Sequence, residues 1–144
     1  MKKFISIAAA AMIFIVTVSS CNKSDDSISS QSAQLSQTVQ QGKWKVTYYN
    51  DNGTVETSTY SGYEFVFSST GTVTATKGAI TVTGTWTNGN DDSTLKLYLN
   101  FGTVSPFEEL NDDWHVTGQS STVITLEDVS GGGSPTDYLT FEKI

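Results

Sequence analysis

Apolar residues recur at every second position through much of the chain after Gly42, and this period constrains the fold more than any other feature. Residues 63–67 and 95–101 are clear examples, with large apolar side chains at alternate positions. Turn residues interrupt the alternation about every eight to twelve positions, which is the spacing typical of β-sandwiches and β-barrels. The pattern therefore predicts an all-β domain.

About eight short strands are expected, each joined to the next by a short turn. This order favours a single up-and-down antiparallel β-barrel, because closing the sheet removes its unpaired edges. Asn52-Gly53 predicts a tight hairpin, since these residues adopt the positive φ angles that such a turn needs. Residues 105–108, Ser-Pro-Phe-Glu, predict a short helical turn as a candidate closure for one end of the barrel.

The alternation also predicts which side chains share a face. Residues 43–49 are expected to form the first strand, with Trp44, Val46 and Tyr48 on one face. Residues 55–60 are expected to form a weaker strand, and Ile80 belongs to the apolar set of a later one.

The predicted interior of the barrel holds mostly large side chains: Trp44, Phe65, Phe67, Trp86, Leu95, Leu97, Leu99, Phe101, Trp114, Ile124, Leu126, Leu139 and Phe141. A barrel of eight strands is just wide enough to be filled by side chains, or to hold one small ligand. A filled core is therefore one hypothesis, and a shallow ligand cleft at one open end is the other. The candidate ligand-binding residues are Trp44, Phe65, Trp86, Phe101 and Trp114.

The N-terminus has the order of a secretory signal peptide over residues 1–20. Lys2 and Lys3 precede a short apolar run, and small residues lead up to Cys21. The run is shorter than the roughly 20 apolar residues of a membrane-spanning helix. Cys21 is the chain's one cysteine, and its setting resembles the lipobox of bacterial lipoproteins. That resemblance implies acylation at Cys21, for example with palmitate, and a lipid anchor in the cell outer membrane.

Residues 21–38 are expected to form a lipidated, flexible, Ser/Gln-rich tether, because Leu35 is an isolated apolar residue among polar ones. The barrel domain then covers residues 39–144. Asp25-Asp26 resembles the acidic export signal that sends some Gram-negative lipoproteins to the outer face of the outer membrane. A solvated acidic linker is the alternative, so the sequence allows either membrane face.

Charge and residue types argue against several functions. The net charge is −7 and there is no arginine, so nucleic acid is not expected as a partner. His115 is the single histidine, and no nucleophile pattern accompanies it. The acidic residues near it, such as Glu108 and Asp112, are read as a solvated loop. We therefore expect no enzyme, no cofactor and no metal site.

A series of motifs in order carries a family resemblance. Gly42-Lys43-Trp44 is similar to the Gly-x-Trp signature of lipocalin-type barrels. It is followed by Tyr-x-Phe-x-Phe at 63–67, Gly-Thr-Trp at 84–86, Leu-x-x-x-Trp at 110–114 and Leu-Thr-Phe-Glu-Lys at 139–143. The series resembles the lipocalin-like lipoproteins of Gram-negative bacteria. This implies an eight-stranded barrel in a family whose members mostly have no established ligand or activity. True lipocalins often stack an arginine on the signature tryptophan, which this chain cannot do.

Two functions follow as hypotheses. The first is a lipid-anchored envelope lipoprotein that binds a small apolar or amphiphilic ligand without catalysis. The alternative is a structural or interaction module with a filled core, which presents loops or exposed tyrosines to a protein or glycan partner. The candidate tyrosines are Tyr49, Tyr60 and Tyr98. The sequence leaves the oligomeric state open.

Overall fold

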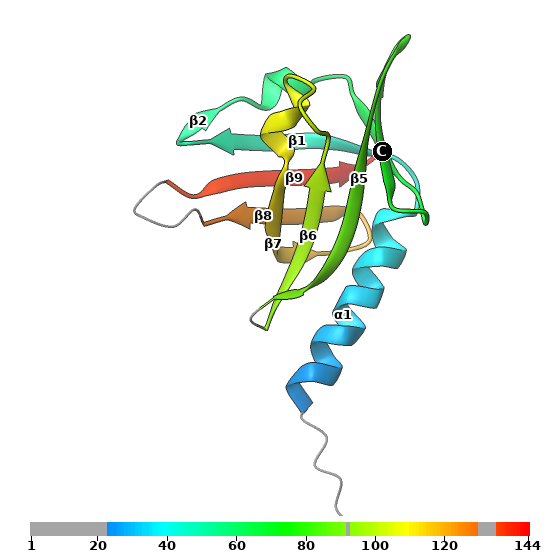
Figure 1. Ribbon diagram of the computed structural model, residues 1–144, viewed down its shortest axis with the longest axis vertical. Helices are drawn as coiled ribbons and strands as arrows, with labels where there is room; N and C mark the ends of the chain where they lie inside the picture. Colours follow the sequence, from blue (N-terminus) through cyan, green and yellow to red (C-terminus); the bar gives the residue numbers. More distant parts are fainter. Residues whose placement is uncertain (1–22, 92, 130–134) are drawn as a thin grey trace, which may run out of the picture.

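The computed structural model describes residues 23–91, 93–129 and 135–144 (Figure 1). The predicted signal peptide and Cys21 lie outside these ranges. The elements in chain order are α1 (Lys23–Val39), β1 (Trp44–Asp51), β2 (Thr54–Val55), η1 (Thr57–Tyr60), β3 (Glu64–Phe67), β4 (Thr72–Lys77), β5 (Ile80–Asp91), β6 (Thr94–Asn100), η2 (Phe107–Leu110), β7 (Asp112–Gln119), β8 (Val123–Asp128) and β9 (Asp137–Lys143).

The sheet closes into the predicted antiparallel barrel. Strands β3 to β8 each pair with the next strand along the chain, and β9 pairs with β1. The ring is completed where Trp44 of β1 pairs with Phe65 of β3. Strand β2 is an extra two-residue strand, which forms a hairpin with the end of β1 across the predicted Asn52-Gly53 turn. Both turn residues have positive φ angles, 50° and 82°, as expected.

The predicted interior residues form the core. Every residue expected inside is buried, as are further apolar residues from the loops and from α1. Phe65 lies among the rings of Phe101, Phe107 and Phe141, with ring centroids 5.2–6.4 Å apart. Such aromatic packing in edge-on geometry is favourable beyond its area alone. The alternation therefore predicts the core correctly.

A β-bulge in β1 corrects one predicted face. The pairing with β9 shifts register between Val46 and Tyr48, so the alternation is interrupted there. Val46 points inward as predicted, but Tyr48 is 40% exposed and Tyr49 is buried in its place. The prediction that Tyr49 is exposed is therefore wrong.

Helix α1 corrects the predicted conformation of residues 23–38, which were expected to be flexible. Leu35 and Val39 lie one turn apart on the same face of the helix, and both are fully buried against the barrel. The indole N–H of Trp44 donates a hydrogen bond to the carbonyl of Val39 at 2.9 Å. Within the described ranges no helix has the length and apolar character needed to cross a membrane.

The C-terminal half of helix α1 packs at one end of the barrel, here called the helix end, where β1 begins and β7 ends, and its N-terminal half projects away from the barrel (Figure 1). The side-chain amide of Asn88, near the end of β5, donates to the carbonyl of Ser32 at 2.6 Å and accepts from the hydroxyl of Ser36 at 2.9 Å. Gln119, at the end of β7, donates to the carbonyl of Gln31. These bonds fix the C-terminal half of α1 to the helix end.

The opposite end, here called the loop end, is closed by η1 and η2. The hydroxyl of Tyr60 donates to the carbonyl of Pro106 at 2.9 Å, and that of Tyr49 donates to the carbonyl of Glu109 at 2.8 Å. Phe107 packs its ring against Tyr60 and is buried. The predicted helical turn is present as η2, although it begins at Phe107 and not at Pro106, and no side chain caps it.

One further prediction near the loop end is wrong. Residues 55–60 form the end of β2 and the helical turn η1, not a strand, and Tyr60, predicted to be exposed, is buried. Ile80, which was not among the predicted interior residues, begins β5 and is 56% exposed, because β5 begins before the point where β6 pairs with it. The β4–β5 hairpin therefore extends beyond the barrel wall, as Figure 1 shows.

Candidate functional site

The five residues predicted to bind a ligand are all part of the packed core. Trp44, Phe65 and Trp114 are at most 1% exposed, and Trp86 and Phe101 at most 7%. The structure brings Phe65 and Phe101 into contact and pairs Trp44 with Phe65 across neighbouring strands. These side chains fill the barrel.

The three tryptophan N–H groups are already used within the protein. Besides the bond from Trp44, the indole of Trp86 donates to the carbonyl of Ser68 at 2.9 Å, and that of Trp114 donates to the carbonyl of Leu110 at 3.0 Å. Each bond ties a buried indole to a backbone group near an end of the barrel. No tryptophan N–H is therefore left to bind a ligand.

A lysine side chain places its positive charge over the ring of Trp44, in a chain that has no arginine. The ammonium group of Lys143 lies 5.1 Å from the centroid of the Trp44 ring. A cation over an indole face is attracted by the negative face of the ring. Lys143 ends β9 and pairs directly with Trp44 in the register of the barrel, so the closing strand supplies the cation.

A hollow of about 500 Å³ lies on the outer face of the barrel, over β5, β6 and the start of β7. We call it the outer groove; its lining residues are Thr85, Trp86, Thr87, Tyr98, Leu99, Asn100, Asn111 and Asp112. Of these, the sequence singled out Trp86 as an interior residue, Tyr98 as an exposed tyrosine and Asp112 as a loop carboxylate. Their meeting in one groove was not predicted, because it depends on the register between three strands.

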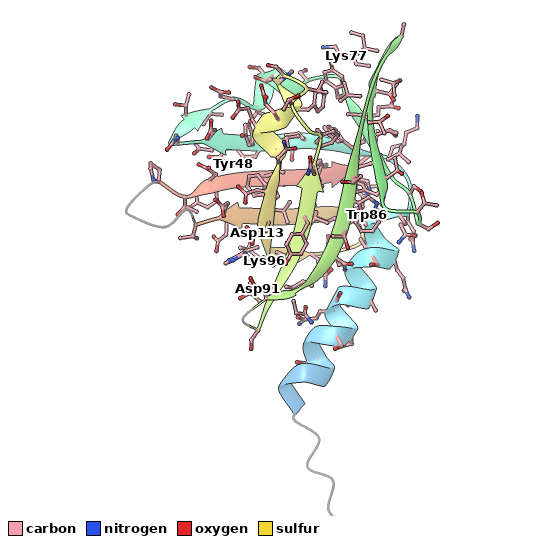
Figure 2. The ribbon with its side chains drawn as sticks, viewed as in Figure 1. Tyr48, Lys77, Trp86, Asp91, Lys96 and Asp113 are labelled. Carbon is pink, nitrogen blue, oxygen red and sulfur yellow. The ribbon has the colours of Figure 1, made fainter. Side chains whose placement is uncertain are left out.

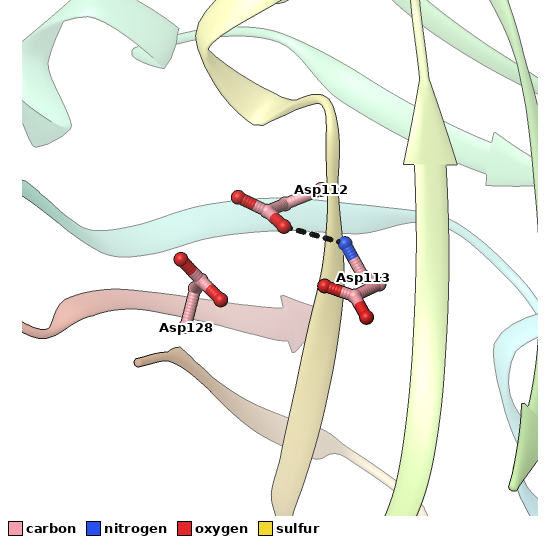
Figure 3. A group of neighbouring side chains, drawn as sticks. All are labelled: Asp112, Asp113 and Asp128. Carbon is pink, nitrogen blue, oxygen red and sulfur yellow. Dashed lines mark hydrogen bonds between the residues drawn. The ribbon is translucent and has the colours of Figure 1, made fainter. Parts of the chain in front are cut away.

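Three carboxylates lie close together beside the outer groove. The oxygens of Asp112, Asp113 and Asp128 lie within 4.8 Å of one another (Figure 3). Burial raises the pKa of Asp112, and the nearby charges of Asp128 and Asp113 raise it further; the backbone hydrogen bond from Asp113 acts in the opposite direction. Oxygen groups of this kind suit a hard cation such as Ca²⁺.

A lysine already neutralises part of this cluster. Lys96 of β6 is only 7% exposed, and its ammonium group donates to the carboxylate of Asp113 at 3.0 Å and to the Asp113 carbonyl at 3.0 Å. Figure 2 shows the two residues side by side on β6 and β7. The hydrogen bond from Lys96 lowers the pKa of Asp113. The cluster thus has a structural role without any ion.

His115 lies partly exposed on β7, in register with Lys96 on one side and Glu127 on the other. The sequence placed it on the polar side of its strand, next to Trp114, and the structure agrees: Trp114 is buried and His115 is not.

No family model and no curated protein matches the sequence. Among solved structures, the fold is similar to that of a DUF4847 family protein from Bacteroides vulgatus ATCC 8482, with a TM-score of 0.51. The superposition covers 76% of this chain and 97% of that chain, and 20% of the residues are identical. At this identity the likeness supports the barrel fold and nothing more specific.

Proposed function

We propose that this chain is a lipid-anchored lipoprotein of the cell envelope, whose barrel presents its outer surface to a partner and performs no catalysis. The filled interior carries this proposal. The five aromatic residues expected to line a ligand site are at most 7% exposed, and they contact one another or donate to backbone carbonyls. A ligand inside the barrel would have to displace them, whereas a partner on the outside would not.

The proposed anchor rests on Cys21 and on the small number of residues between it and the first helix. Helix α1 begins at Lys23, two positions after Cys21, and its 17 residues give it a length of about 25 Å. Because Leu35 and Val39 fix α1 to the barrel, an acyl group on Cys21 would turn the helix end towards the membrane. The loop end would then face away from it.

Charge does not set this orientation, because both signs occur near the helix end. Lys43, Lys45 and Lys143 lie there, but Lys43 forms an ion pair with Glu64 and Lys45 is directly opposite Glu142 on β9. The orientation therefore rests on the position of α1 alone. The partner-binding surface would accordingly lie on the barrel wall and the loop end.

We also propose kinship with the lipocalin-like lipoproteins. The Gly-x-Trp position begins the first barrel strand, and Trp44 packs under the cation of Lys143 from the last strand. A cation over the signature tryptophan is the arrangement that an arginine provides in true lipocalins.

Replacing Cys21 tests the anchor. Cys21→Ser removes the acylated thiol, so the protein should move from the membrane fraction to the soluble fraction of the cell, and labelling with an alkyne analogue of palmitate should be lost. Ser24→Ala, which leaves the thiol intact, is the matched control and should keep both the label and the membrane fraction. If Cys21→Ser stays in the membrane fraction, the proposed anchor is wrong.

Protease treatment of intact cells tests the membrane face. Export by the Asp25-Asp26 segment predicts that the barrel is removed from the outside. Complete protection, with digestion after the outer membrane is opened, would place the barrel on the periplasmic side.

A further inference from the structure

The outer groove has a regular wall on β5 and β6. Thr85 pairs with Asn100 and Thr87 with Tyr98, so two threonines face an amide and a phenol across the two strands. These side chains point outward, because they alternate with the buried Trp86 and Leu99. Between them the floor of the groove is the strand backbone at Trp86 and Leu99, whose side chains point into the barrel.

The ring of Tyr98 leans over a glycine. A Cβ atom on Gly89 would lie 3.6 Å from Cε2 of Tyr98, so the ring packs over the bare backbone of β5. The ring of Tyr98 therefore lies on the Gly89 side of the groove, and Thr85 and Thr87 line the groove beyond it. This gives the groove an aromatic side and a hydroxyl-lined side.

Backbone hydrogen bonds hold the polar groups of the other wall in place. The side-chain oxygen of Asn100 accepts from the N–H of Gly102 at 2.7 Å, and one carboxylate oxygen of Asp112 accepts from the N–H of Asp113 at 2.7 Å. Asn111 binds the backbone on both sides of this loop, through the N–H of Phe101 and the carbonyl of Gly102. The wall is therefore fixed before any ligand arrives.

Several polar atoms of the groove have no hydrogen bond to any described residue. These are the amide NH₂ of Asn100 and the hydroxyls of Thr85, Thr87 and Tyr98. Together they offer the fixed donors of one amide and hydroxyls that both donate and accept. They surround the aromatic ring of Tyr98.

We propose that the outer groove binds a neutral carbohydrate. A sugar ring carries hydroxyls that both donate and accept, and it also has an apolar C–H face that packs on an aromatic ring. Both requirements are met by the groove. Its one charged lining residue is the acid Asp112, with Asp113 and Asp128 close by, so phosphorylated, sulfated and carboxylated ligands are repelled. The volume of about 500 Å³ falls in the usual range of small-molecule sites.

This inference rests on the proposed outer-surface function and names its ligand class. The groove is open on one side, so most of the bound sugar stays in water. We therefore expect weak binding to a single site, with a Kd of roughly 1 mM.

Nuclear magnetic resonance titration tests the proposal. The mature chain, residues 21–144 with Cys21→Ser, is labelled with ¹⁵N and titrated with maltohexaose, cellohexaose and mannohexaose up to 10 mM. At least one of these sugars should shift the amide signals of β5, β6 and the start of β7. Tyr98→Ala should weaken binding about tenfold or more, because it removes the ring on which the sugar packs.

Matched variants separate binding from folding. Tyr138→Ala removes a tyrosine that is 42% exposed on β9, outside the groove, and should leave the Kd unchanged. Thr87→Val keeps the shape of the side chain but removes one hydroxyl of the groove, and should weaken binding several-fold while the amide spectrum stays that of the folded chain.

Three results would overturn the proposal. One is the absence of any shift with all three sugars at 10 mM. Another is a set of shifts outside the groove that Tyr98→Ala does not change. The third is binding of tetramethylammonium or Ca²⁺ in the groove without binding of any sugar, which would assign it to cations. None of these results affects the proposed anchor, which the fractionation of Cys21→Ser tests by itself.

Discussion

Inside the barrel, the polar atoms of the aromatic residues have partners, whereas several polar atoms of the outer groove have none among the described residues. Trp44, Trp86 and Trp114 each donate to a backbone carbonyl, and Tyr49 and Tyr60 do the same at the loop end. In the groove, the hydroxyl of Tyr98 and the amide of Asn100 still have free hydrogen-bonding capacity.

The difference has a physical cause. An unpaired polar group inside a protein costs a large part of a hydrogen bond, so few are left unpaired there. Among the described residues, Oε1 of Gln119 at the helix end is one. A group that faces water has no such cost and can exchange water for a ligand. Binding capacity in this molecule is therefore to be sought on the barrel wall, although the aromatic residues lie inside.

Truncating a central core ring should have the largest effect. Phe65→Ala removes a ring that contacts Phe101, Phe107 and Phe141, and should lower the free energy of unfolding by about 3–5 kcal/mol. Urea unfolding followed by tryptophan fluorescence measures it. Val66→Ala, at a side chain on the same strand that is 39% exposed, should cost less than about 0.5 kcal/mol. A loss below about 1 kcal/mol for Phe65→Ala would mean that the ring lines open space.

The next effect concerns the helix end. Leu35→Ala should cost about 2–3 kcal/mol, because the fully buried side chain joins α1 to the barrel. Gln37→Ala, at an exposed position of the same helix, is the control. If the two variants unfold at the same urea concentration, α1 does not pack on the barrel and residues 23–38 behave as the flexible tether expected from composition.

Substitutions at two glycines of β5 allow a direct comparison of the barrel interior with its outer face. A Cβ on Gly84 would lie 2.6 Å from the carbonyl oxygen of Asn100 and 2.7 Å from the ring of Phe101, so Gly84→Ala should cost about 1–3 kcal/mol. A Cβ on Gly89 would meet Tyr98 at an ordinary 3.6 Å, and Gly89→Ala should stay within about 0.5 kcal/mol. Equal costs, measured as shifts in the thermal midpoint, would contradict the described packing of β5.

The smallest effects on stability are expected in the carboxylate cluster, where substitutions at Asp113 and Asp112 should change the free energy of unfolding in opposite directions. At neutral pH, Asp113→Asn should lower stability by about 1 kcal/mol, because it leaves the buried Lys96 without its carboxylate partner, while the 44% exposure of Asp113 limits the loss. Asp112→Asn should raise stability by a few tenths of a kcal/mol, because it removes a charge that burial and two neighbouring acids disfavour.

The pH dependence follows from the directions of the two shifts. The lowered pKa of Asp113 gives stability that is present above the ordinary carboxyl pKa of about 3.9 and is lost as the pH falls through the lowered value. The raised pKa of Asp112 removes stability as the pH rises through its own raised value. Urea unfolding of both variants between pH 3 and pH 7 checks this. A larger loss for Asp112→Asn than for Asp113→Asn would contradict the assigned roles.

Much of the fold could be predicted because alternation and turn residues are local signals. The buried strands, the Asn52-Gly53 hairpin and the helical turn η2 were all predicted from residues that lie next to one another in the sequence. Tyr49 is buried in place of Tyr48 because a β-bulge inserts one residue into β1, and no residue pattern in the sequence indicates the bulge. Helix α1 was missed because Leu35 and Val39 gain their burial from the barrel end, which composition does not describe.

The outer groove could be predicted only in part. The threonines of β5 read as ordinary solvent-facing strand residues, and that reading explains them fully at the level of one strand. The groove arises from the pairing of Thr87 with Tyr98, the ring that lies over Gly89, and the hydrogen bonds of Asn111 across the loop that follows β6. The first two contacts join residues of neighbouring strands, which only the register brings together, and the third joins the two ends of the loop between β6 and β7.

Native mass spectrometry of the chain from its own organism tests the filled interior most directly. The Cys21→Ser protein, exported with its signal peptide and purified without detergent, should have the mass of the bare mature polypeptide under native and denaturing conditions alike. A reproducible extra mass that is lost on denaturation, and that persists in Tyr98→Ala, would show a cargo held inside the barrel and contradict the account.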